Sequence, residues 1–298
     1  MKILRTPEEK FTSIPDYPFQ PHYIDVSEDL RMHYVDEGPS DGEVVLLLHG
    51  EPSWSYLYRK MIPVFVEAGY RAIAPDLIGF GKSDKPVEMD DYTYASHTEW
   101  LMSLITQLKL TGINMFCQDW GGLLGLRIAG LHPNLFSRIV AGNTMLPNGK
   151  GKPSEAFLQW QSYSKTAEVL AINKVMQNST VTKLTEEEIN AYWSPFPDKE
   201  YMAGAKIFPS LVPTSEDDPA IPTNLEAWKG LTGFTKPFLC LFSDKDPITA
   251  GGEKILKKYI PGTNDMPHQT ITDAGHFLQE DKGNEIANIM VDFMRKYE

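Results

Sequence analysis

Cysteine is scarce in this chain, because only 2 of its 298 residues are cysteines. Both of them, Cys117 and Cys240, fall in stretches that we expect to be core strands. A small domain held by disulfides would use cysteine far more densely, and a structural zinc site would need several clustered ligands. We therefore expect neither a disulfide framework nor a metal site. The sequence also carries no cofactor motif, and we expect no organic cofactor.

Long apolar runs are missing as well. A membrane-spanning helix needs about 18 or more consecutive apolar residues, and the chain has no such run. Residues Met1 to Gln20 hold charged side chains and prolines where a signal peptide would have an apolar segment. We therefore expect a cytoplasmic protein without a membrane partner.

Positive charge is in deficit, since 28 Lys and Arg residues stand against 40 Asp and Glu residues and give a formal net charge of −12. This charge disfavours binding to nucleic acid, whose phosphates would repel the protein. Apolar residues make up 42% of the chain and charged residues 23%, as in an ordinary globular protein. Internal repeats are absent, so we expect one folded core with an inserted subdomain.

Strand-like and helix-like stretches alternate along most of the chain. Alternating apolar residues at 21–26 and 31–36 predict an antiparallel hairpin at a sheet edge. Further strands are expected at 44–48, 71–75, 112–116, 138–142, 238–242 and 269–271, and helices at about 54–67, 92–110, 123–132, 251–260 and 284–297. This order predicts an α/β fold with a doubly wound, mostly parallel sheet, whose ligand site lies beyond the carboxyl ends of the strands.

The alternation stops between residues 147 and 228. This segment reads as helices and turns with proline, methionine and aromatic residues, and it contains no convincing parallel strand. Its clearest helices are expected at 155–170 and 185–193, and the second opens with Thr185 and Glu188 at capping-box spacing. We therefore divide the chain into a core domain, residues 1–146 and 229–298, and an inserted helical cap, residues 147–228.

The chain has no Gly-x-Ser-x-Gly, the motif that places a nucleophilic serine at a sharp strand-to-helix turn. The stretch Phe116-Cys-Gln-Asp-Trp-Gly-Gly122 has the same pattern with an aspartate, Asp119, at the turn. Such a turn needs small residues two before and two after its apex, and Cys117 and Gly121 meet that need. Held there and kept ionised by the following helix, the carboxylate would point into a cavity and could attack carbon. The alternative is an ordinary helix N-cap.

Four chemically active side chains follow predicted strands and so are expected at the same edge of the sheet: Glu51, Asp119, Asp246 and His276. The chain order of nucleophile, acid and histidine is typical of alpha/beta hydrolases. Two carboxylates, Asp244 and Asp246, compete for the place of the acid that orients His276. We predict Asp246 and expect Asp244 to be a surface or turn residue. The other position where such folds place the acid holds Asn143 and offers no carboxylate.

Taken together, these residues resemble the haloalkane dehalogenases, and the resemblance covers nearly the whole chain. The matching stretches are His49-Gly-Glu-Pro52, Gln118-Asp-Trp-Gly-Gly122, Asp246, Asp273-Ala-Gly-His-Phe277 and Tyr192-Trp-Ser-Pro-Phe-Pro-Asp198. They look like the subfamily with Glu after His-Gly and its acid after the later strand. The resemblance implies an alpha/beta-hydrolase fold and an enzyme that splits carbon–halogen bonds with water, giving an alcohol, a halide ion and a proton.

The resemblance also implies a role for each residue of the site. Asp119 would attack the halogen-bearing carbon, displace halide and form an alkyl ester. His276, held by Asp246, would then activate water to hydrolyse the ester. The backbone N–H groups of Glu51 and Trp120 would form the oxyanion hole, and the Glu51 side chain would help to hold the water.

Halide is too weak a base to benefit from a proton, so its site needs neutral N–H donors such as indole. The resemblance implies Trp120 as one donor and Trp160, in Phe157-Leu-Gln-Trp160, as the second, chosen over Trp193 and Trp228. Trp160 could instead pack a helix face only. Apolar cavity walls are implied from residues that could equally be ordinary core residues: Phe157, Leu123, Ile248 and Phe277.

Two other functions stay open at this point. Epoxide hydrolases share a similar Asp-Trp elbow, but their leaving alkoxide needs an acidic O–H, which Tyr163 or Tyr192 could supply from the cap. The second alternative is a catalytically silent member of the fold that binds small molecules, and an intact triad argues against it. We expect a monomeric or weakly associated protein whose partners are a halogenated alkane, water and halide.

Overall fold

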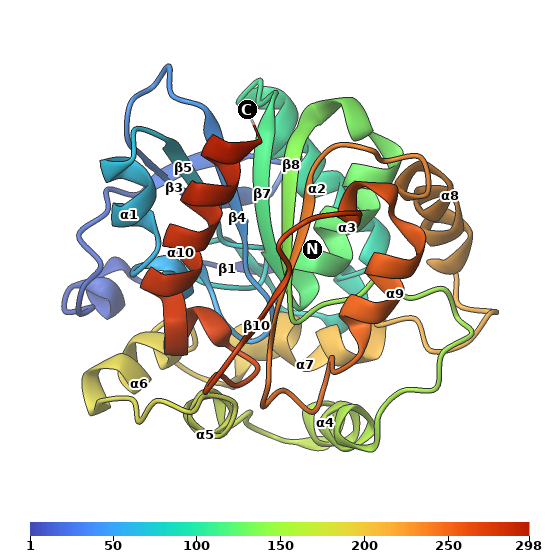
Figure 1. The fold of residues 1–298 in the computed structure, drawn as a ribbon. Coiled ribbons are helices and arrows are strands. Elements are labelled where there is room, and N and C mark those ends of the chain that lie inside the picture. The colour runs from blue at the N-terminus through green and yellow to red at the C-terminus, as the bar shows by residue number, and fades with distance from the viewer. Residues whose placement is uncertain (298) are drawn as a thin grey trace.

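The computed structural model describes residues 1–297. Within them, one eight-stranded sheet has the order β10-β9-β8-β7-β4-β5-β3-β2 (Figure 1). Its strands are β2 (His22–Asp25), β3 (Arg31–Glu37), β4 (Val44–Leu48), β5 (Arg71–Pro75), β7 (Ile113–Gln118), β8 (Phe136–Gly142), β9 (Phe238–Ser243) and β10 (Gln269–Ile271). Two short strands, β1 (Ile3–Leu4) and β6 (Lys85–Pro86), pair separately. In the large sheet β2 and β5 run antiparallel to β3 and the other neighbours are parallel, which confirms the predicted fold.

Helices cover both faces of the sheet, and β4 shows the consequence. Leu46 and Leu48 point into one apolar core and Val45 and Leu47 into the other, and all four are at most 1% exposed. The first core is covered by α2 (Tyr94–Gln107), α3 (Trp120–Leu131) and α9 (Gly252–Tyr259), and the second by α1 (Ile62–Glu67) and α10 (Leu278–Lys296). Burial on both faces explains why this strand reads as an unbroken apolar run.

Two helices differ from expectation. The segment expected as one helix at 54–67 is a 3-10 turn, Ser55–Tyr58, followed by the separate helix α1. Pro63 explains the break, because in a continuous helix its ring would clash with the carbonyl group four residues earlier. The last helix, α10, begins earlier than expected and is kinked at Lys282, whose φ of −135° is non-helical. In the described part of the chain no helix is long and apolar enough to cross a membrane.

Between β8 and β9 the chain forms a 3-10 turn, Lys199–Met202, and the helices α4 (Glu155–Thr166), α5 (Ile172–Asn178), α6 (Glu186–Trp193), α7 (Ala203–Leu211) and α8 (Ile221–Leu231). The first four helices lie beyond the carboxyl ends of the strands (Figure 1). Helix α6 opens with the expected capping box of Thr185 and Glu188. Helix α8 packs along α3, where Gly230 approaches the Gly130 carbonyl too closely for a side chain. The expected cap boundary at residue 228 therefore falls inside a helix that contacts the core.

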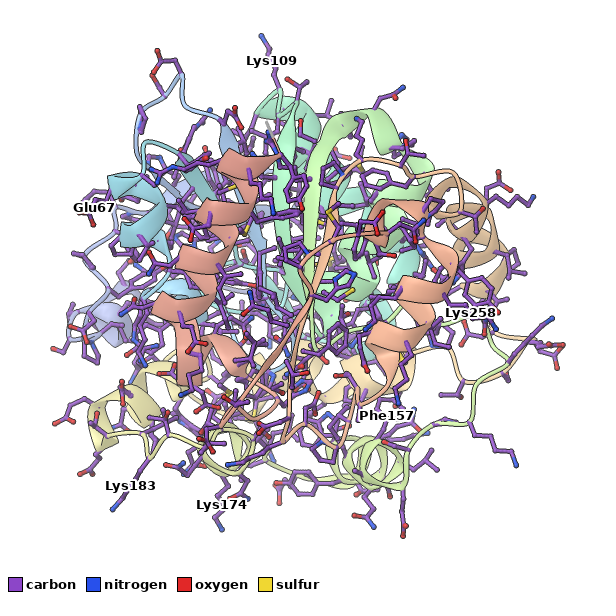
Figure 2. All side chains as sticks on the ribbon, viewed as in Figure 1. Glu67, Lys109, Phe157, Lys174, Lys183 and Lys258 are labelled. Atoms are coloured by element: carbon purple, nitrogen blue, oxygen red, sulfur yellow. The ribbon has the colours of Figure 1, made fainter. Side chains whose placement is uncertain are left out.

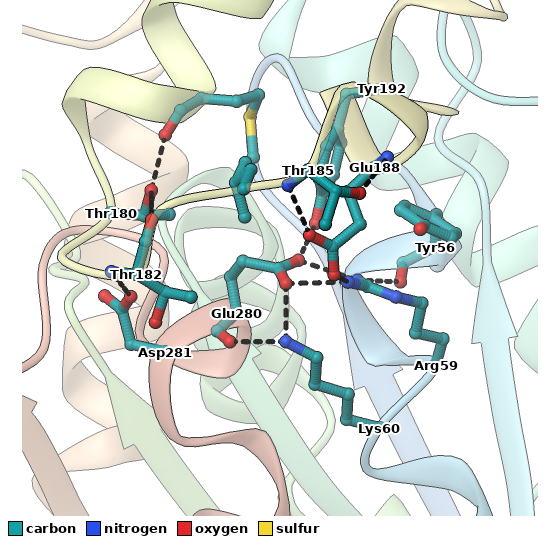
Figure 3. A network of polar contacts seen from close by, with 12 residues as sticks. Tyr56, Arg59, Lys60, Thr180, Thr182, Thr185, Glu188, Tyr192, Glu280 and Asp281 are labelled. Carbon is teal, nitrogen blue, oxygen red and sulfur yellow. Dashed lines mark hydrogen bonds and ion pairs between the residues drawn. The ribbon is translucent and has the colours of Figure 1, made fainter. Parts of the chain in front are cut away.

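A buried polar cluster joins α6 to the core (Figure 3). Arg59 donates to both carboxylate oxygens of Glu280 at 2.7 Å and to Glu188 of α6 at 2.7 Å. Lys60 and Tyr192 also donate to Glu280, at 2.6 Å and 2.5 Å. Burial would raise the pKa of Glu280, but Arg59 and Lys60 lower this pKa to about 2. The cluster holds the cap helix α6 against the first turn of α10.

Candidate active site

Asp119 occupies the sharp turn between β7 and α3. Its φ of 50° and ψ of −126° lie in a region that residues with side chains rarely adopt. Gly121 has no room for a side chain, because a Cβ atom there would lie 2.0 Å from the carbonyl oxygen of Leu48. Gly50 is restricted in the same way, since its Cβ atom would lie 2.3 Å from Asp119 Oδ1. These two glycines allow β4, α3 and the Asp119 carboxylate to approach one another.

The Asp119 carboxylate faces the loop after β4 and makes no cap to its own helix. Its Oδ1 accepts a hydrogen bond from the backbone N–H of Glu51 at 2.8 Å. The backbone carbonyl of Asp119, and not its side chain, accepts the N–H groups of Gly122 and Leu123 at the start of α3. The ordinary N-cap alternative for Asp119 is therefore ruled out, and the carboxylate remains available for chemistry.

His276 lies in the loop between β10 and α10, between two carboxylates. Its Nδ1 is 3.1 Å from Asp246 Oδ2, and its Nε2 is 3.5 Å from Asp119 Oδ2. Because an ionised carboxylate can only accept, Nδ1 carries a proton and donates it to Asp246. Burial of the ring lowers the pKa of His276, but Asp246 and Asp119 outweigh burial and raise this pKa to about 10.

Asp246, and not Asp244, lies beside the histidine. The Asp246 carboxylate is 5% exposed and accepts the backbone N–H groups of Ile248 at 2.9 Å and Thr249 at 3.2 Å, as well as the Thr249 hydroxyl. Burial would raise the pKa of Asp246, but His276 and these donors lower this pKa to about 2. Asp246 is therefore held as a carboxylate, whereas Asp244 is exposed on the same loop.

Three residues that the sequence motifs left without a role hold His276 or its partner Asp246. Asn143 donates its side-chain N–H to the backbone carbonyl of His276 at 2.9 Å, and Thr249 holds Asp246. Gln118 donates to the same His276 carbonyl at 3.2 Å, and its Nε2 lies 3.1 Å from His276 Nε2. Asn143 and Thr249 each follow a strand end and Gln118 adjoins the nucleophile, so position at the catalytic edge was the signal that could have identified them.

A cavity of about 670 Å³ lies between the elbow and the cap. Its wall includes the expected residues Glu51, Asp119, Trp120, Phe157, Trp160, Ile248, His276 and Phe277. The wall is completed by α4, α5 and α7, and Figure 2 labels two of its residues, Phe157 on α4 and Lys174 on α5. Leu123 was expected in the cavity wall, but it is not among the described residues that line the cavity. Leu123 lies about one helical turn beyond Trp120, farther along α3, and is 5% exposed in the apolar core.

Glu51 and Trp160 meet from opposite sides of the cavity, one from the core and one from the cap. Burial and the neighbouring Asp119 raise the pKa of Glu51 well above its ordinary value. A hydrogen bond from the Trp160 side chain and the charge of His276 act in the opposite direction on this pKa. Among residues 1–297 there is no hydrogen-bond partner for Glu51 Oε1. The Trp160 side chain therefore reaches Glu51 at the cavity and is not confined to packing a helix face.

The competing tryptophans and tyrosines have other surroundings. Trp228 donates its indole N–H to a backbone carbonyl at 3.1 Å, and Trp193 packs against the apolar core without joining the described cavity wall. The hydroxyl of Tyr192 donates to Glu280 in the cluster of Figure 3. Tyr163 lines the cavity, and its hydroxyl accepts a backbone N–H at 3.1 Å.

Comparison with known proteins identifies the family. The model of the alpha/beta hydrolase fold matches residues 43–283. A haloalkane dehalogenase of Psychrobacter cryohalolentis is 54% identical, with 99% of this chain and 98% of the relative covered. A haloalkane dehalogenase of Mycobacterium marinum is 46% identical, with 98% of this chain and 99% of the relative covered.

A solved structure agrees with these relatives. The haloalkane dehalogenase DpaA of Paraglaciecola agarilytica, described as tetrameric, is 40% identical and superposes with a TM-score of 0.91 over 97% of both chains. The superposed 97% of the chain includes the sheet, the elbow and the helices between β8 and β9. The chain therefore belongs to the haloalkane dehalogenases, hydrolases of the alpha/beta-hydrolase fold.

Proposed function

We propose that this haloalkane dehalogenase works through a covalent alkyl ester on Asp119. The observation that supports the proposal is the series of contacts from the Glu51 N–H through Asp119 and His276 to Asp246, beside the cavity of about 670 Å³. In the first step a carboxylate oxygen of Asp119 attacks the carbon that bears the halogen. The carbon–halogen bond breaks, and halide leaves with its electron pair.

In the second step water hydrolyses the ester. The Nε2 atom of His276 faces Asp119, so it would take a proton from a water molecule that attacks the ester carbonyl carbon. Asp246 holds the ring through Nδ1 and stabilises the imidazolium that forms. The N–H of Glu51, together with the N–H of Trp120 at the start of α3, would donate to the oxyanion, and the Glu51 carboxyl would help to hold the water. The products are an alcohol, halide and one proton.

The halide would lie between Trp120 of the core and Trp160 of the cap, since both line the cavity. An indole N–H donates a hydrogen bond and indole nitrogen accepts none, which suits an anion that is too weak a base to take a proton. Phe157, Ile248 and Phe277 would surround the alkyl chain with apolar wall. This mechanism uses no metal and no organic cofactor.

The organisation of the molecule around this site is part of the proposal. Residues 147–228 would act as a cap over a core of residues 1–146 and 229–298, with α8 returning the chain to the core. A monomeric state and a cytoplasmic location remain predictions. Because DpaA is described as tetrameric, the monomeric state is the prediction that a measurement of mass in solution should test first.

Halide release from 1,2-dibromoethane, measured beside diol formation from styrene oxide, tests the reaction class. We expect halide to be released and no diol to form. Diol without halide would indicate an epoxide hydrolase with Tyr163 as the acid in the cavity. Binding of either compound without any product would indicate a silent binding protein.

A further inference from the structure

The side chain of Gln118 makes two contacts with one residue, His276. Gln118 is the last residue of β7 and is 0% exposed. Its Nε2 donates to the backbone carbonyl of His276 at 3.2 Å and lies 3.1 Å from the ring atom Nε2. The amide therefore reaches the atom that must act as the base in ester hydrolysis.

Two neighbours determine which way this amide points. The His276 carbonyl can only accept a hydrogen bond, so the nitrogen of the Gln118 amide must face it. The Gln118 oxygen faces Gln279, whose Nε2 is 3.5 Å away. An amide nitrogen carries two hydrogens, and with one directed to the carbonyl, the second is directed to Nε2 of the ring. Nδ1 holds its proton for Asp246, so the neutral ring presents an unprotonated Nε2 to this donor.

The charged groups around the ring act against this donor. Asp246 faces the ring from the loop after β9 and Asp119 from the elbow, while Glu51, whose own pKa is raised by burial and Asp119, faces it from the loop after β4. Asp281 of α10 also approaches the histidine loop, but its carboxylate binds the backbone N–H of Gly275 at 2.8 Å. Negative charge at the ring favours the imidazolium, which cannot take a proton from water. Alkylation of Asp119 removes one of these charges, and that of Asp246 remains.

We propose that Gln118 is a positioning residue for the second step, in which its amide N–H keeps His276 neutral and its Nε2 available as an acceptor while the ester is present. A donor that faces Nε2 stabilises the neutral ring and opposes the imidazolium, because a protonated Nε2 would set N–H against N–H. The hydrogen bond to the His276 carbonyl holds the histidine loop against the end of β7, next to the elbow. As water approaches, Nε2 gives up the hydrogen bond from the Gln118 amide and accepts one from the water molecule. This role rests on the proposed ester mechanism and goes beyond it.

Gln118→Met tests the role, because methionine has a similar length and no N–H. The enzyme is mixed with excess 1-bromobutane and quenched, and intact-protein mass spectrometry follows the decay of the ester at a series of pH values. We expect the pH midpoint of ester decay to rise by about one unit, since loss of the donor removes roughly tenfold preference for the neutral ring. Ester formation requires no base and should change far less than ester decay.

Two further variants separate this role from simple packing. Gln279→Met removes a neighbouring buried amide and leaves the Gln118 N–H groups in place, so its midpoint should match that of the parent. Gln118→Glu keeps the shape and puts a further carboxyl group at the ring, so its midpoint should rise as well. It also serves as the test if the methionine variant fails to fold.

A midpoint in Gln118→Met and Gln118→Glu equal to that of the parent would overturn the proposal, as would a shift of the same size in Gln279→Met. A parent enzyme that never carries the ester would overturn the ester mechanism together with this role. A parent that carries the ester, beside Gln118 variants with an unshifted profile, would overturn this role alone.

Discussion

The carboxylate of Asp246 holds His276 in one orientation and one tautomer. In Asp246→Asn a neutral amide replaces the carboxylate, so the ring loses its charged partner at Nδ1 and the stabilisation of its cation. We expect alcohol formation to fall by about three to four orders of magnitude, with the alkyl ester still formed. Asp244→Asn makes the same chemical change on the same loop and should keep most of the alcohol formation. Loss in the Asp244 variant alone, in single-turnover assays, would move the role of acid to Asp244.

The Trp160 indole is the only part of that side chain that can stabilise a leaving halide by donation. Trp160→Phe keeps most of the apolar volume and removes the N–H, and loss of one such transition-state hydrogen bond costs about 2 to 4 kcal/mol. We therefore expect carbon–halogen cleavage to slow by roughly 30- to 1000-fold and halide binding to weaken. The matched control is Trp228→Phe, because the Trp228 N–H is bound to a backbone carbonyl away from the cavity. Rates for Trp160→Phe equal to those of the parent would exclude Trp160 from the halide site.

Residues with a distinctive local pattern could be predicted from the sequence. The elbow motif located Asp119, and the late Asp-Ala-Gly-His stretch located His276. Gln118 and Asn143 could not be given roles, because their contacts with His276 exist only when the strand ends come together. Thr249 contacts Asp246 on its own loop, a local contact that no motif records. An amide or a hydroxyl at a strand end can make many different contacts, and only the folded structure shows which one it makes.

At the scale of elements, the attachment of α6 and α10 to the core depends on Glu280. Glu280→Gln removes the charge that neutralises the buried Arg59, and breaking a buried ion pair on one side costs about 3 to 5 kcal/mol. We expect a loss of this size in the free energy of unfolding, measured in urea at neutral pH. The matched control is Glu186→Gln, the same change at an exposed site of α6, which should cost little.

The stabilisation by Glu280 should also depend on pH. Its pKa is lowered from 4.5 to about 2 in the folded protein. A group with a lowered pKa stabilises the fold above its unfolded value and loses that contribution as the pH falls through the folded value. The difference in unfolding free energy between the parent and Glu280→Gln should therefore be constant above about pH 5 and shrink towards pH 2. A difference that stays constant down to pH 2 would contradict this assignment.

Most elements of the core could be predicted from periodicity alone, and the failures have local causes. The strands at 44–48 and 71–75 and the edge hairpin agree with the structure, since burial on one or two faces leaves a direct pattern. Pro63 divides the expected helix at 54–67. The early start of α10 was missed because its first turn is held by tertiary contacts of Glu280 and Asp281, which no helical pattern records.

At the scale of the whole molecule, the state of association is the open prediction. We expect a monomer of 33.6 kDa, although the relative DpaA is described as tetrameric. Sedimentation velocity over a range of micromolar concentrations would distinguish the two. One species with the mass of a single chain is the expected result. A species of four chains that persists on dilution would show that the prediction is wrong.

The central claim concerns the whole reaction, in which Asp119 and His276 act in different steps, and His276→Ala separates them. A carboxylate needs no base to attack a bromoalkane, whereas water needs a base to attack the ester. Mass spectrometry of the variant after exposure to 1-bromobutane should show one butyl group on the peptide that contains Asp119. Halide should be released in a single stoichiometric burst, and Asp119→Ala should show neither signal. Unmodified protein with continuing turnover, or an alkyl group on another peptide, would contradict the account.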